Sequence, residues 1–129
     1  MTVVPIYAAL CGLLLIFLSA RVIRQRRRSK VALGDAGKPE MRRAMRVQAN
    51  FAEYAPLALL LLALAELQGL DPVILHGLGV LLLLGRLLHA FGVAREPENF
   101  RFRVTGMVLT FGTIAAASLA NLTGGLLLL

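Results

Sequence analysis

Two long stretches without a charged residue most constrain the fold of this chain. Residues 2–20 and residues 104–129 contain no Asp, Glu, Lys or Arg. About 20 apolar helical residues cross the ~30 Å hydrocarbon core of a bilayer, so each stretch is long enough to span a membrane. The chain is also 58% hydrophobic and has no tryptophan, unlike a typical soluble domain built around one core. We therefore expect an integral membrane protein.

Two further apolar segments lie between these stretches, and turn residues separate them. Pro39 followed by Glu40 suits the first turn of a helix, and Asp71 followed by Pro72 suits an N-cap and first turn. Pro56 falls inside the second helix, where it removes a backbone donor and predicts a local kink. We predict one all-α domain, a membrane four-helix bundle with helices at about residues 2–27, 40–67, 72–94 and 102–124.

The net charge of +7 could indicate nucleic-acid binding, but the positions of the charges argue against it. Apart from Arg86, every Lys and Arg lies within residues 21–46 or residues 95–103, and the intervening link 68–72 has none. This pattern follows the positive-inside rule and places the first and third links in the cytoplasm, with both termini outside. Lysine is scarce relative to arginine, which favours a GC-rich genome. We therefore expect a bacterial inner membrane protein that binds membrane lipids and no nucleic acid.

A polar stripe enters the membrane on the predicted second helix. Arg46, Asn50 and Glu53 are spaced i, i+4 and i+7, which places them on one helix face. Ionisable groups at membrane depth are costly and are functional candidates. The alternative is a structural role, in which Glu53 neutralises an arginine and Asn50 bonds a neighbouring helix.

The predicted third helix carries a second buried cation, Arg86. Its natural partner is Glu53, unless Arg86 extends to the interface instead. His89 follows Arg86 by three residues and shares its face. His76 lies at the opposite membrane side, so the two histidines do not predict a metal site.

Arg101 and Arg103 come just before the expected fourth helix. Unsatisfied N–H groups and the helix dipole supply positive potential there, so an anion would meet both effects. The sequence has no nucleophile–base pair and no glycine-rich phosphate loop. Any chemistry must therefore come from a bound substrate or cofactor.

Residues 46–56, with sequence RVQANFAEYAP, are preceded by Arg26 and Arg27 and followed by Arg86. This pattern resembles the MAPEG family, the membrane-associated proteins in eicosanoid and glutathione metabolism. The resemblance implies a homotrimer that binds glutathione between protomers at the cytoplasmic side. It implies glutathione contacts for Arg26, Arg46, Gln48, Asn50, Glu53, Tyr54 and Arg86, and thiol activation by Arg101 or Arg103.

Glutathione fits this set chemically, because two carboxylates and one ammonium call for several cations and one anion. Two positions depart from the family pattern: His89 and Val93 stand where active members carry aromatic hydroxyls. His89 can still form a hydrogen bond with the ligand, whereas Val93 cannot. We predict a transferase or peroxidase that directs the glutathione thiolate to a lipophilic electrophile or hydroperoxide. A non-catalytic lipid-binding scaffold and a small transporter are the alternatives.

Overall fold

The computed structural model describes residues 1–127, which form four α-helices and no strand. The helices are α1 (Val4–Ser29), α2 (Pro39–Leu67), α3 (Pro72–Ala94) and α4 (Phe100–Leu127). Each is long and apolar enough to cross a membrane. The prediction of an all-α, multi-pass membrane protein is therefore confirmed.

Local sequence signals explain where three of these helices begin. Pro39 stands in the first turn of α2, where a missing N–H costs nothing. Asp71 caps α3 by accepting a hydrogen bond of 2.8 Å from the backbone N–H of Val73. The side chain of Asn99 likewise accepts from the backbone N–H of Phe102 at 3.1 Å, at the start of α4. These caps fix the short turns that bring α3 and α4 beside α2.

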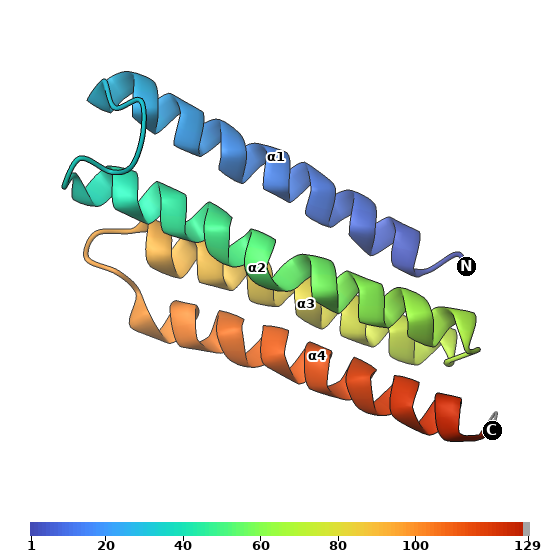
Figure 1. The fold of residues 1–129 in the computed structure, drawn as a ribbon. Coiled ribbons are helices and arrows are strands. Elements are labelled where there is room, and N and C mark those ends of the chain that lie inside the picture. Colours follow the sequence, from blue (N-terminus) through green and yellow to red (C-terminus); the bar gives the residue numbers. More distant parts are fainter. Residues whose placement is uncertain (128–129) are drawn as a thin grey trace.

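The four helices run alternately up and down (Figure 1). The links α1–α2 and α3–α4 lie at one end of the bundle, here called the link end. The N-terminus, the α2–α3 turn and the end of α4 at Leu127 lie at the other end. α2 and α3 form the centre, while α1 and α4 make no close contact with each other within residues 1–127. Both groups of basic residues therefore gather at the same end.

α3 and α4 approach each other closely at glycines, among them Gly85 and Gly106. A Cβ atom on Gly106 would lie only 2.5 Å from the backbone nitrogen of His89. One on Gly85 would lie 2.9 Å from the carbonyl oxygen of Gly106. The backbones are therefore in contact there, as small residues permit between membrane helices. This contact sets Arg86 and His89 directly against α4.

Glu66 caps α1 from the end of α2. Its carboxylate accepts hydrogen bonds from the backbone N–H groups of Thr2, Val3 and Val4, the last two at 2.8 Å. These donors have no partner within the helix, and a negative charge complements the helix dipole. Glu66 thus joins α1 to α2 at the end opposite the links.

Candidate functional site

A cavity of about 250 Å³ lies at the link end, between α2, α3, the link 95–99 and the start of α4. Its lining carries four arginines and one glutamate, so it favours an anionic ligand. The lining residues are Pro39, Arg42, Arg43, Arg46, Asn50, His89, Val93, Glu98 and Arg103.

Arg86 is buried next to this cavity, with only 1% of its surface exposed. Its guanidinium donates to the side-chain oxygens of Asn50 and Thr110, the latter at 3.3 Å, and contacts the sulfur of Met107 at 3.8 Å. The ring of Phe51 lies 5.8 Å from the guanidinium carbon, within cation–π range. Arg86 Nε and His89 Nδ1 have no hydrogen-bond partner within residues 1–127. A buried cation is thus held by neutral acceptors, which leave its charge available to a ligand.

The expected pairing of Arg86 with Glu53 is wrong. The carboxylate of Glu53 instead faces Arg46 on its own helix, with a nitrogen–oxygen distance of 3.4 Å. Both of those side chains are about half exposed, so their attraction is screened by solvent. Arg86 also does not extend to the interface, because it is enclosed between α2 and α4. Asn50 therefore takes the place that the sequence assigned to Glu53.

Glu98 connects α2 and α4 at the edge of the cavity. Its carboxylate contacts Arg103 on α4 at 2.7 Å and Arg43 on α2 at 3.1 Å. Arg43 also donates to the carbonyl oxygen of Val93 at the end of α3. The hydrogen bond from Arg103, followed by that from Arg43, holds the pKa of Glu98 below its ordinary value of 4.5. Glu98 thus positions two of the cavity arginines.

The contacts of Glu98 with Arg43 and Arg103, here called the Glu98 clamp, predict that the stability of the protein depends on pH. A lowered carboxyl pKa contributes stability above the ordinary value of 4.5, and this is lost as the pH falls through the lowered value. We expect the melting temperature of the wild type in detergent to fall more steeply below pH 4.5 than that of Glu98→Gln. Parallel curves for the two proteins would show that the clamp does not contribute to stability.

Comparison with known proteins shows the family to which this four-helix chain belongs. Residues 4–123 match the model of the MAPEG family. The chain belongs to the MAPEG family. It is 38% identical over 117 residues to inner membrane protein YecN of Escherichia coli K12. The aligned residues cover 91% of this chain and 88% of YecN. The YecN protein of Escherichia coli O6:H1 matches to the same extent. The resemblance stated from residues 46–56 is therefore confirmed.

The residues predicted from the MAPEG resemblance divide into two groups. Four line the cavity, and Arg86 lies beside it through its bond to Asn50. The four are Arg46, Asn50, His89 and Arg103.

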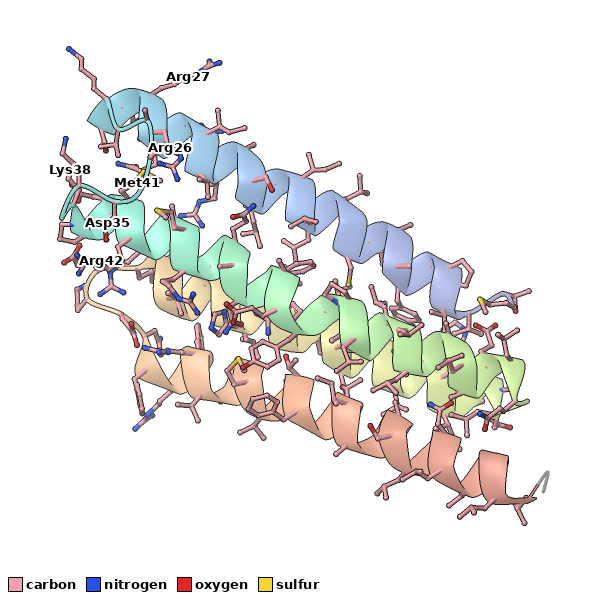
Figure 2. All side chains as sticks on the ribbon, in the orientation of Figure 1. Arg26, Arg27, Asp35, Lys38, Met41 and Arg42 are labelled. Atoms are coloured by element: carbon pink, nitrogen blue, oxygen red, sulfur yellow. The ribbon has the colours of Figure 1, made fainter. Side chains whose placement is uncertain are left out.

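The second group does not line the cavity of this chain. Gln48 faces α1 and donates to Ser19 at 3.3 Å, and Arg26 donates to the carbonyl of Gly34 in the first link at 3.0 Å (Figure 2). Tyr54 packs edge-on against Phe111, with ring centroids 5.3 Å apart. The others are Glu53, at the exposed edge of α2, and Arg101, exposed on α4.

Three cavity residues were missed by sequence reasoning, namely Arg42, Arg43 and Glu98. The two arginines precede Arg46 by about one helical turn, a spacing that places them near its face. They had been attributed to positive-inside topology alone, although their spacing was visible. Arg42 also pairs with Asp35 of the first link at 2.7 Å; both residues are labelled in Figure 2. Glu98 lies in the third link, and its partners become apparent only when α2 and α4 are brought together.

Proposed function

We propose that this MAPEG protein is a membrane-bound glutathione transferase or peroxidase that activates the glutathione thiol for attack on lipophilic electrophiles or hydroperoxides. The observation that carries the proposal is the cavity at the link end. It joins cationic side chains from α2 and α4 beside a buried arginine on α3. Such an arrangement suits a small, polar, multiply charged ligand at the membrane surface.

The charges of the cavity complement those of glutathione. Its two carboxylates match the guanidinium groups of Arg42, Arg43 and Arg46, since arginine binds a carboxylate at two points and orients it. Its ammonium group matches a carboxylate, and Glu53 pairs with the cavity residue Arg46 at the edge of α2, although it does not line the cavity itself. The ligand is thereby oriented as well as attracted.

Arg103 is the residue we assign to thiol activation. It lines the cavity, whereas Arg101 does not. A free cysteine thiol has a pKa near ~8.5, and a guanidinium at the sulfur lowers it by stabilising the thiolate. The proton passes to solvent, and the thiolate forms a carbon–sulfur bond as the leaving group departs. With a hydroperoxide, two glutathione molecules are oxidised to the disulfide as the peroxide becomes an alcohol and water.

A neighbouring protomer completes the site in this proposal. One chain offers about 250 Å³, below the ~300–1,000 Å³ typical of small-molecule sites. Arg26 and Gln48, which match glutathione-binding positions of the family, face away from the cavity of their own chain. In a homotrimer, these residues would face the next protomer's cavity. They would add the charge and the enclosed volume that the ligand needs.

The second substrate reaches this site from the bilayer. α1 and α4 lie at the edges of the bundle and expose large apolar side chains, among them Phe17 and Phe111. A lipophilic electrophile can partition along these faces toward the link end. We place the link end in the cytoplasm and the protein in a bacterial inner membrane, in line with its basic links and its YecN relatives.

Glutathione binding tests the proposal through Arg46. We expect Arg46→Ala to weaken binding by about 10- to 100-fold, because a hydrogen bond between charged groups contributes ~1.5–3 kcal/mol. Calorimetric titration of the detergent-solubilised protein measures it, with Arg95→Ala as control, since Arg95 is exposed and outside the cavity. Size-exclusion chromatography with light scattering reports assembly. If Arg46→Ala binds normally, or if it loses assembly instead, the polar stripe serves structure rather than glutathione.

A further inference from the structure

A second basic pocket lies at the link end, on the α1 side of the bundle. Its volume is about 340 Å³, and α1, α2 and the third link supply its walls. Its charged lining consists of Arg21, Arg24, Arg28, Arg43, Glu40 and Glu96. Glutathione binding as proposed uses none of Arg21, Arg24 and Arg28.

These three arginines form one stripe on α1. Their spacing of i, i+3 and i+7 places them on the same helix face, toward α2 and α3 rather than around the helix. Within residues 1–127, none of Arg21, Arg24 and Arg28 makes an ion pair. Arg27 lies off this stripe and points away from the bundle (Figure 2). The pocket thus concentrates positive charge that the fold itself does not neutralise.

A separate apolar slot lies next to this pocket, further from the link end. It measures about 60 Å³ and lies between α1 and α3, with Phe17, Leu87 and Phe91 in its walls. Arg21 lines both the slot and the basic pocket. A ligand that fills both therefore needs an anionic head joined to an apolar chain.

We propose that an anionic phospholipid binds at this junction, with its phosphate among Arg21, Arg24 and Arg28 and an acyl chain along the slot. Arginines at the end of a membrane-spanning helix lie at the depth of lipid phosphates, and basic pockets between such helices bind acidic headgroups. Glu40 and Glu96 in the pocket wall can accept hydrogen bonds from headgroup hydroxyls. Phosphatidylglycerol, which carries one phosphate and two free hydroxyls, fits this set. The slot distinguishes it from free phosphate, which would leave the aromatic walls unused.

Spin-labelled lipids in vesicles of phosphatidylcholine containing the protein test this site. The motionally restricted fraction measures association of phosphatidylglycerol relative to phosphatidylcholine. For the wild type we expect a preference of about fivefold or more, equivalent to ~1 kcal/mol. Arg21→Gln/Arg24→Gln should reduce it to less than about twofold, whereas Arg27→Gln and the charge-preserving Arg21→Lys/Arg24→Lys should retain it.

A second variant keeps the test decisive if the double substitution impairs folding. Phe91→Ala retains every arginine, and Phe91 is 58% exposed, so the fold should tolerate the change. We expect it to halve the preference or reduce it further by removing a wall of the slot. Equal association of both lipids with the wild type would overturn the proposal, as would equal losses in Arg27→Gln and the double variant. Displacement of the lipid by millimolar inorganic phosphate would assign the pocket to free phosphate instead.

Discussion

Arg103→Ala is expected to lower the rate of glutathione conjugation by about 100-fold, the effect typical of removing one group that stabilises developing or resident negative charge. The guanidinium lies in the cavity wall at the start of α4, where the helix N-terminus adds positive potential. Without it the thiol titrates nearer its ordinary pKa, so less thiolate is present at neutral pH. A chromogenic electrophile and saturating glutathione measure the effect.

Two controls separate thiol activation from the other role of Arg103. Arg101→Ala removes a neighbouring arginine that does not line the cavity, and we expect its rate to stay within about twofold of the wild type. Glu98→Gln removes the negative charge from the 2.7 Å contact to Arg103 but keeps the guanidinium. If Glu98→Gln loses as much activity as Arg103→Ala, the arginine acts by holding the link rather than by stabilising sulfur.

Asn50→Leu is expected to destabilise the protein by about 3 kcal/mol, more than removal of the charged residue that Asn50 contacts. Arg86 is 1% exposed, and its guanidinium bonds to the side chain of Asn50. Loss of that oxygen leaves part of a buried charge without a partner. Arg86→Met removes the charge itself and leaves Asn50 in a cavity that water can enter, so we expect only about 1 kcal/mol.

A double-mutant cycle checks this ordering by unfolding in mixed micelles. Arg86→Met/Asn50→Leu should be no less stable than Asn50→Leu alone, because the uncompensated charge is gone. If the two single changes add, or if Arg86→Met costs more than Asn50→Leu, then Arg86 stabilises the bundle through packing. Asn50 would then not offset a free-energy cost of burying the charge of Arg86.

The helices were predictable from the sequence because the membrane imposes a simple rule. A span of about 20 apolar residues must satisfy its backbone within itself, so uncharged stretches and proline-marked turns suffice to locate it. The predicted second and third helices, 40–67 and 72–94, compare with α2 at Pro39–Leu67 and α3 at Pro72–Ala94. At the first and last helices the bounds differ by two or three residues, because the length of an apolar segment locates a span but does not fix its terminal residues.

From helix periodicity alone, the site was predictable only where its residues share one helix, and the family resemblance added His89 and Arg103 from other helices. The spacing of Arg46 and Asn50 is visible in the sequence, and both line the cavity. Contacts between helices were not predictable, since they depend on how the helices rotate against each other. Arg86 therefore contacts Asn50 rather than Glu53, and Glu98 joins Arg43 to Arg103. Opposite charge alone had suggested the Glu53 pairing, but a neutral oxygen one turn earlier on the same stripe lies against Arg86.

The ultraviolet band of the glutathione thiolate, recorded as glutathione is titrated into the detergent-solubilised protein at neutral pH, tests the central claim most directly. The account predicts a saturable band in the wild type and in Arg101→Ala, and its loss in Arg103→Ala. A folded wild-type protein that produces no band would contradict thiol activation. The cavity would then belong to a lipid-binding scaffold or to a protein that uses another thiol.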